Sequence, residues 1–589
     1  MLHQESGDLM LKKELSVARG IEKAELVLKN ADIINVFTES IEHADIAICN
    51  GFIVGIGEYE GEEEIDCSGK FAAPGFIDGH IHLESSMLKP VEFARAVLPH
   101  GTTSVITDPH EIANVCGING IEYMMEASEG LPLDIYFMLP SCVPSTSFDE
   151  SGCVLKAKDL EVLYKKENVL GLAEVMDYVG TIHGDDEILQ KIGHAKLYNR
   201  VIDGHAPGLH GKDACAYITA GIQSDHECVS MDEAKEKLSL GQWIMIREGT
   251  AAKNMDNLIG LFQPPYHQRS MLVSDDKNPY DILEYGHIDD MLRSAISKGA
   301  DPCIAVKMAT FNTANYFGLK NVGAIAPGYK ADIVLISDLE EMKVESVIKF
   351  GKMIVNNHRL IEITNPPIDN EILEKVYNSF HCREMNPNDF EFLFKKEDTS
   401  LDYFRVIQLR KGEICTKEIK IPMVGDKPEI LIQEDILKIA AIERHHNTNH
   451  IGLGYVNGYG LKKGAIASSV SHDAHNIIVI GTNNEDIANA ANFIRDMQGG
   501  WVISLEGKII ARLPLPIAGL ISDLDAVTLA NKIKELKEIA RNLGVEDGID
   551  PFMTLGFVSL PVIPELRLIT TGLFHVNLQR IVPLIHERE

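Results

Sequence analysis

The sequence predicts an α/β protein built around a (β/α)8 barrel, with a small β domain split around the barrel and a C-terminal α+β domain. Eight strand-like apolar runs alternate with helical patterns over residues 75–318. Short strand-like segments flank that stretch on both sides, and residues 375–589 lose the alternation. This rhythm and length are typical of a barrel. A doubly wound open sheet is the competing interpretation, but no GxGxxG motif opens the first strand–helix unit.

The small β domain is expected to come from two distant segments. Residues 24–72 have the pattern of short strands, interrupted at Asn50 and Gly51 by a hairpin signal. Residues 321–357 are similarly short-stranded and rich in turns. One domain made from both segments would hold together the two ends of the chain between them. The predicted boundaries are 1–72 and 321–374 for the composite β domain, 73–320 for the barrel and 375–589 for the last domain.

The predicted barrel strands are apolar runs that end in polar residues. In chain order they are GFIDGHIH, TTSVITD, LDIYFML, VLGLAEV, NRVIDGH, AGIQSDH, QWIMIRE and SMLVSDD. Helical patterns such as AKDLEVLYKKE, DEILQKIGHAKLY and SMDEAKEKLSL follow most of them. In the last domain, AIASSVS and NIIVIGT predict strands, whereas NEDIANAANFIRDM and LANKIKELKEIARNL predict helices.

Composition excludes several classes of partner. The 589 residues carry 87 acidic and 55 basic side chains, a net charge of -32, which disfavours nucleic acid and anionic membrane as partners.

The ten cysteines are scattered without a CxxC pair, as expected for reduced thiols. The first residues lack the apolar segment of a secretory signal, and no apolar run is long enough to span a membrane. A cytoplasmic location is therefore expected.

Histidines and acids stand at the ends of five predicted strands. His80 and His82 lie two apart on the first strand, so their side chains point the same way. Polar residues end four later strands in the same manner: Glu174, His205, His226 and Asp275. Strand C-termini converge on one face of a barrel. Four imidazoles and two carboxylates suit Zn, Mn or Fe, and Glu174 could bridge two ions. A lone histidine is more often packed than ligating; the ordered set is what indicates a metal site.

This order of ligands resembles the amidohydrolase superfamily, whose first-strand signature is similar to PGFIDGHIH, with GAIAPGYKADIVL resembling part of its usual split β domain. Within it, the chain resembles the adenine deaminase family from about residue 25 onward. The resemblance rests on the stretches PGFIDGHIHLESSM, GTTSVITDPHEIANV, LAEVMD, DGHAPGL, SDHE, SDD and GAIASSVSHDAHNIIVIGTN.

The resemblance implies a metal-dependent hydrolase that converts adenine to hypoxanthine and ammonia. It implies two divalent metal ions, Mn(II) or Fe(II) in preference to Zn(II). Glu174 stands where many relatives carry a carboxylated lysine, which favours the deaminase branch. Hydrolysis of a cyclic amide or an N-acetyl group is the alternative reaction, and a scaffold without chemistry is a third hypothesis. We expect adenine as the small-molecule partner, no nucleic acid or membrane, and a homo-oligomer, either a dimer or a tetramer.

Three barrel residues are candidates for the chemistry. Asp275 is expected to take a proton from the attacking water and to pass one to the leaving amine. Glu84 and His110 are candidates for the contact to purine N1, where negative charge develops, and for holding the ring. The alternatives are that Glu84 orients a ligand histidine and that His110 braces its loop.

Two histidine-rich stretches lie in the last domain, ERHHNTNH and SVSHDAHN. The family resemblance implies that Asp473 and His475, in the second stretch, lie near the barrel mouth, help to close it and contribute to substrate binding. The alternatives are a solvated loop and a second metal cluster made of His445, His446, His450, Asp473 and His475.

Overall fold

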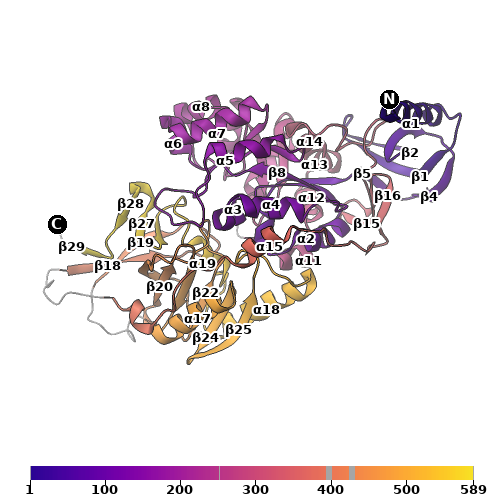
Figure 1. Cartoon of the computed structure of the whole chain (residues 1–589). Helices are drawn as coiled ribbons and strands as arrows, with labels where there is room; N and C mark the ends of the chain where they lie inside the picture. Colours follow the sequence, from indigo (N-terminus) through magenta and orange to yellow (C-terminus); the bar gives the residue numbers. More distant parts are fainter. Residues whose placement is uncertain (1, 251, 393–400, 423–431, 588–589) are drawn as a thin grey trace.

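The computed structural model describes residues 2–250, 252–392, 401–422 and 432–587; the parts of the predicted domains outside these ranges are not described. The chain forms three parts in a row (Figure 1). A β sheet with the N-terminus lies at one end, a helix-covered barrel in the middle, and a second large sheet at the other end. The split β domain, the barrel and the C-terminal part therefore follow one another as predicted.

The first sheet takes its strands from both sides of the barrel, as predicted. Its described strands come from two ranges, 24–74 and 333–360. They are β1 (Ala24–Asn35), β2 (Ser40–Cys49), β3 (Phe52–Gly57), β4 (Gly61–Asp66), β5 (Phe71–Pro74), β14 (Ile333–Asp338), β15 (Lys343–Lys349), β16 (Lys352–Asn356) and β17 (Arg359–Leu360). The two groups join where β5 pairs antiparallel with β14, with Ala73 opposite Val334. We propose that the barrel segment begins directly after β5.

The hairpin predicted at Asn50 and Gly51 joins β2 to β3, with Cys49 opposite Phe52. Both turn residues have positive φ, 54° and 80°, the conformation of the tight turn that matches strand twist. A helix that the sequence analysis did not predict, α1 (Leu2–Ala18), precedes this sheet and packs on β2 and β3.

Eight parallel strands form the barrel, each within a predicted run. They are β6 (Phe76–Ile81), β7 (Thr102–Thr107), β8 (Asp134–Leu139), β9 (Val169–Val175), β10 (Val201–Gly204), β11 (Ser224–Asp225), β12 (Trp243–Arg247) and β13 (Ser270–Val273). Two sets of hydrogen-bonded strands, β6 to β10 and β11 to β13, together form the barrel. They meet where Gln223 N donates to Ile202 O and where Asp275 N donates to His80 O, each at 2.9 Å.

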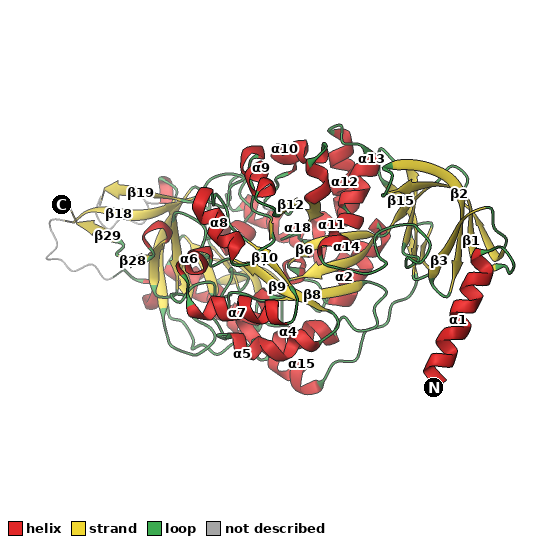
Figure 2. Ribbon diagram, turned by 90° about the horizontal axis from the view of Figure 1, so that it is seen from above, coloured by secondary structure: helices red, strands yellow, loops and turns green. Residues whose placement is uncertain are grey.

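Helices surround these strands, as Figure 2 shows from above. They are α2 (Pro90–Val97), α3 (His110–Cys116), α4 (Ile118–Glu126), α5 (Ala157–Leu160), α6 (Tyr178–His183), α7 (Asp186–Leu197), α8 (Gly211–Thr219), α9 (Met231–Ser239), α10 (Met255–Leu258), α11 (Pro279–Tyr285), α12 (Ile288–Ser297), α13 (Pro302–Met308) and α14 (Phe311–Tyr316). The helix predicted over AKDLEVLYKKE is shorter than expected, because α5 continues as a 3-10 turn over Glu161–Lys165. Apolar side chains of helices and strands form the core between them.

The C-terminal part is α+β, as predicted. Its large sheet contains β18 (Leu401–Gln408), β19 (Lys417–Pro422), β20 (Ile436–Ile442), β21 (Ile451–Asn457), β22 (Ala465–Ser468), β23 (Ile477–Gly481), β24 (Gly500–Leu505), β25 (Lys508–Pro514) and β29 (Ile585–Glu587). A small sheet contains β26 (Leu566–Ile569), β27 (Gly572–His575) and β28 (Arg580–Val582). The helices are α15 (Asn370–Tyr377), α17 (Asn484–Asp496), α18 (Ala526–Asn542) and α19 (Met553–Phe557). Among the described residues, no helix is both long and apolar enough to cross a membrane.

Candidate active site

The structure brings the six predicted ligand residues together at the C-terminal mouth of the barrel. His80 lies on β6 and Glu174 on β9, and the others stand one or two residues after strand ends. Glu174 lies at the centre of the group. Its Oε1 is 3.2 Å from His82 Nε2, and its Oε2 lies 2.7 Å from His205 Nδ1 and 3.2 Å from His226 Nε2. One carboxylate therefore faces both halves of the set.

Asp275 closes the other side of this group. Its Oδ1 lies 3.1 Å from His82 Nε2 and 3.7 Å from His80 Nε2. Its Oδ2 accepts a hydrogen bond from Arg247 Nη1 at 2.9 Å. Burial alone would raise the pKa of Asp275, but His82 and Arg247 outweigh it and hold that pKa well below its usual range. The Asp275 carboxylate is therefore ionised.

These residues fit divalent metal ions. His82 Nδ1 lies 3.2 Å from the carbonyl oxygen of Asp108, to which it donates, so Nε2 is the free lone pair that faces Glu174 and Asp275. His80 Nε2 is buried without a hydrogen-bond partner among the described atoms. An orphaned imidazole nitrogen beside two carboxylates is a costly arrangement unless a cation occupies it. Ligand atoms of His80, His82 and Asp275 lie within 4.8 Å of one another, as do those of His80, Glu174 and His226.

Charged residues that the sequence analysis did not assign to the site surround the ligand group. Glu227 forms an ion pair with Arg247 and lies 3.7 Å from His205 Nδ1 and 3.6 Å from His226 Nε2. Asp276 and Glu111 also line the cavity above the ligands. Glu227 and Glu111 follow histidines in the motifs SDHE and TDPHE, and both members of each pair line the cavity, although the sequence predicts only the histidines for the site.

His110 faces this cavity, as the sequence analysis expected. Its Nδ1 donates to Asp108 Oδ2 at 2.9 Å, which fixes the ring. Its Nε2 lies 3.7 Å from Glu111 Oε1 and 3.8 Å from Asp473 Oδ1. Glu84, by contrast, is not among the cavity-lining residues: its Oε1 accepts from the backbone N–H of Ile112. Burial raises the pKa of Glu84 to about 7.

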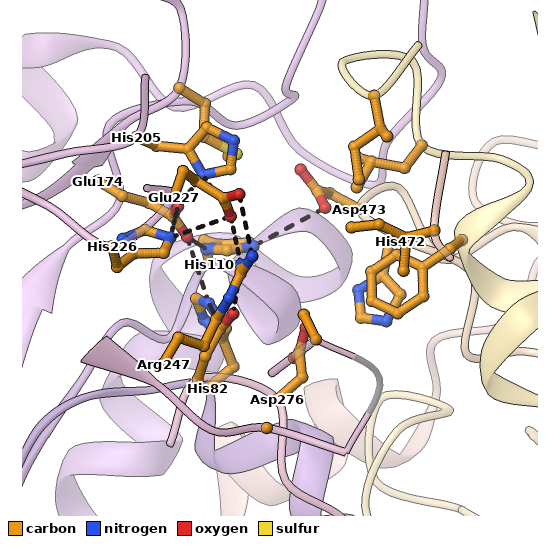
Figure 3. Close-up of a pocket in the computed structure, with 18 of the residues that line it drawn as sticks. His82, His110, Glu174, His205, His226, Glu227, Arg247, Asp276, His472 and Asp473 are labelled. Carbon is orange, nitrogen blue, oxygen red and sulfur yellow. Dashed lines mark hydrogen bonds and ion pairs between the residues drawn. The ribbon is translucent and has the colours of Figure 1, made fainter. Parts of the chain in front are cut away.

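The C-terminal domain supplies the opposite side of the cavity (Figure 3), where Asp473 and His472 face the barrel ligands. Asp473 Oδ2 is buried and has no hydrogen-bond partner among the described atoms. Burial, together with the nearby Glu111, raises the pKa of Asp473 to about 6. At neutral pH this leaves an ionised carboxylate oxygen that is free to accept a hydrogen bond.

His475 lies behind the cavity wall, where it contacts Glu111 of the barrel. The backbone N–H of Ser471 donates to His475 Nδ1 at 3.1 Å, so the proton of the neutral ring is on Nε2 and is donated to Glu111. His472 Nδ1 lies 2.6 Å from the other oxygen of Glu111. Burial would raise the pKa of Glu111, but these histidines hold it well below its usual range. Two histidines of one domain thus orient an acid of the other.

The remaining histidines of the ERHHNTNH stretch bond to the surrounding chain. His445 Nε2 donates to Ala474 O at 2.7 Å, and His446 Nε2 donates to Ser151 O at 3.0 Å. His450 Nδ1 lies 2.8 Å from Glu150 Oε1. Ser151 and Glu150 belong to the long loop after β8, so His446 and His450 connect the barrel to the C-terminal domain, whereas His445 bonds within its own domain.

Two family models match the chain. The amidohydrolase family matches residues 71–354, which include the barrel and its ligands. The adenine deaminase C-terminal domain matches residues 413–580, which include His472, Asp473 and His475.

Curated relatives match nearly the whole chain. Adenine deaminase 2 of Carboxydothermus hydrogenoformans is 45% identical over 98% of this chain and 99% of its own. The chain belongs to the adenine deaminase family. Adenine deaminases of Clostridium acetobutylicum and Kosmotoga olearia are 46% and 47% identical and cover 96% and 98% of this chain, at 98% and 99% of their own lengths. The family predicted from the sequence is confirmed.

A solved structure also matches part of this adenine deaminase family member. It is a β-aspartyl dipeptidase of Fervidobacterium islandicum AW-1, at 18% identity and a TM-score of 0.44. The match covers 58% of this chain and 99% of the dipeptidase.

Proposed function

We propose that this protein hydrolyses adenine to hypoxanthine and ammonia at the cavity between the barrel mouth and the C-terminal domain. The observation that carries the proposal is the cluster of four imidazoles and two carboxylates with Glu174 at its centre, under a cavity whose far side comes from the adenine deaminase C-terminal domain. The relatives named adenine deaminase match over almost the full chain.

Two divalent ions fit this ligand set. One would be held by His80, His82 and Asp275, and the other by His205 and His226, with Glu174 between them. Nitrogen and oxygen donors suit Mn(II) and Fe(II), which the family resemblance favours over Zn(II). When bound, such ions supply a nucleophile at neutral pH, because they lower the pKa of water from 15.7 to about 7.

The protein's own residues handle the protons. Asp275 Oδ1 faces the ligand histidines and takes the proton of the attacking water, while Arg247 holds Oδ2 and keeps the carboxylate ionised. Asp275 then passes a proton to the leaving amine at C6. His110 and Glu111 line the cavity beside this position and are placed to contact the purine ring nitrogens. Glu84 supports the Ile112 backbone behind them.

Asp473 is the substrate-binding residue that the C-terminal domain contributes. Its free Oδ2 can accept the N–H of the purine imidazole ring, a hydrogen bond to a charged acceptor in a buried site. His475 acts on the cavity only indirectly, because its hydrogen bond holds Glu111 in place.

Ammonia release from adenine, adenosine and cytosine tests this function, with metal content measured on the same preparation. We expect turnover of adenine with bound divalent metal. Turnover of a cyclic amide or an N-acetyl compound without adenine turnover would instead support the alternative amidohydrolase reaction. The scaffold hypothesis would be supported if protein expressed with Mn or Fe contained no bound metal and did not turn over adenine.

We further propose a cytoplasmic homo-oligomer, a dimer or a tetramer, with no nucleic acid or membrane partner. All ten cysteines of the chain are free thiols, which suits a reducing compartment. Light scattering coupled to size-exclusion chromatography measures the oligomeric state.

A further inference from the structure

Four apolar side chains form the part of the cavity that faces the barrel ligands from the C-terminal domain. We call them the apolar wall: Ile414, Phe557, Leu560 and Ile563. Ile414 lies in the loop between β18 and β19, and the other three lie between the end of α19 and the start of β26. Two segments more than 100 residues apart in the chain therefore build one surface.

The apolar wall is a small cluster that borders two cavities. Ile414 and Phe557 line both the cavity at the barrel mouth and a neighbouring cavity of about 140 Å³. Phe557 and Leu560 pack together, and Ile414 and Ile563 pack against them. A contact that holds the backbone of both segments would therefore fix the shape of this cluster.

Arg567, on β26, is placed to do this. Its guanidinium donates to the carbonyl oxygens of three wall residues: Nε to Ile563 O at 2.6 Å, Nη1 to Phe557 O at 2.9 Å and Nη2 to Ile414 O at 2.9 Å. Nη2 also donates to Pro564 O at 2.8 Å. One side chain therefore ties both segments of the wall together.

Arg567 is an unusual residue to bury. It is fully buried, and in the described part of the chain no carboxylate forms an ion pair with it. Burial lowers its pKa to about 9. A charged group without a counter-charge is costly in an interior, and an apolar side chain of similar length would avoid that cost. What arginine adds is a rigid planar fork of five donors.

The wall also reaches the polar side of the cavity. The ring of Phe557 stacks on that of His472, with centroids 4.4 Å apart and planes at 12°. His472 in turn bonds Glu111, so a shift of the Phe557 backbone moves a residue that contacts the cavity acid.

We propose that Arg567 is a positioning residue that fixes the apolar wall against which the planar substrate lies. The proposal rests on the proposed function, in that the ligand is adenine. Arg567 does not line the cavity and bonds none of the candidate metal ligands, so its loss should leave the metal site intact. Substrate binding should weaken because the backbone of the apolar wall loses the contacts that fix it.

The test compares Arg567→Ala and Arg567→Lys with the wild-type holoenzyme. We expect KM for adenine to rise roughly ten- to hundredfold in Arg567→Ala, the range for lost hydrogen bonds from a charged donor. Metal content should be unchanged and kcat should fall by less than about threefold, the signature of lost ground-state binding. Lysine can replace only some of the hydrogen bonds of arginine, so KM should rise less in Arg567→Lys than in Arg567→Ala. Guanidinium ion at non-denaturing concentration should lower KM of Arg567→Ala and leave wild type unaffected.

Arg405→Lys is the matched control. Arg405 lies on β18 of the same domain, donates to Pro583 O and pairs with Glu418, and does not line the cavity. Its substitution should leave KM unchanged. Folded, metal-loaded Arg567 variants with wild-type KM would overturn the proposal. Loss of metal together with kcat, or failure of both variants to fold, would also overturn it, because either result marks a purely structural role. Wild-type protein inactive on adenine would overturn the proposed function first and this inference with it.

Discussion

The barrel and the C-terminal domain present opposite surfaces to the same cavity. The barrel side is crowded with imidazoles and carboxylates that converge within a few ångströms of Glu174. The other side is the apolar wall, one free carboxylate oxygen of Asp473 and the ring of His472. Under the proposed function, the barrel supplies the metal ligands, the proton transfer and polar contacts to the ring, whereas the C-terminal domain adds an apolar surface for a flat substrate and one carboxylate. Four substitutions would break or sharpen this comparison, in order of expected effect.

Asp275→Asn should give the largest loss. The amide can still coordinate through oxygen but cannot carry the proton, so turnover should fall by about 10²- to 10⁴-fold or more while much of the metal remains. Steady-state kinetics and metal analysis on the same sample measure both. Turnover close to wild type would remove the proton-shuttle role from Asp275.

Glu174→Gln should affect metal more than fold. A carboxylate between the two ligand groups offers two charged oxygens, whereas the amide offers one neutral oxygen. Metal content should fall from about two ions toward one per chain, with a corresponding loss of activity. Atomic emission analysis after dialysis measures this, and thermal unfolding controls for the fold. Unchanged metal content would show that Glu174 does not bridge.

Asp473→Asn should reduce kcat/KM for adenine about ten- to hundredfold without metal loss, because a charged acceptor is removed from a buried hydrogen bond. The wild-type preference for adenine over 9-methyladenine should shrink in the same variant if the bond is to the N9–H. Equal effects on both substrates would place Asp473 elsewhere on the ring. Unchanged kinetics for adenine in the metal-loaded variant, or in Asp473→Ala, would remove this residue from the substrate site.

His475→Ala should have the smallest effect, about tenfold in kcat/KM, because His475 acts only through Glu111, which keeps its bond to His472. His450→Ala is the matched control, since His450 also connects the domains but bonds Glu150 rather than Glu111. Comparable losses in both variants would show that the domain contact, not the orientation of Glu111, is what matters.

The same division explains what the sequence could predict. All eight barrel strands lie within the predicted runs, because buried parallel strands are apolar and end in polar residues. The six candidate ligand residues could be located because they stand at the ends of five strands, and the barrel geometry brings strand ends together. Wall residues such as Ile414, in a loop, and Phe557, at the end of α19, have no such rule, because an apolar side chain carries no signal that distinguishes a cavity from a core.

Additional polar residues of the cavity were also beyond sequence reasoning. Glu111, Glu227 and His472 each line the cavity together with the adjacent residue that the sequence predicts for the site. Whether a second polar residue joins the first depends on loop geometry after the strand or helix end. Arg567 could not be found either, because a lone arginine on a strand is usually taken as exposed and gives no sign that it binds carbonyl groups.

The order of the two surfaces along the chain has a consequence during synthesis. Asp275, the last ligand, leaves the ribosome more than 100 residues before Ile414, the first wall residue. At about 5–20 residues per second, that interval is several seconds or longer. We expect a nascent barrel to meet the surrounding metal pool with its mouth open, and the later domain to enclose ions already bound. A chain that ends after residue 374 should accordingly lose its ions to a chelator faster than the full-length protein; equal rates would contradict this sequence of events.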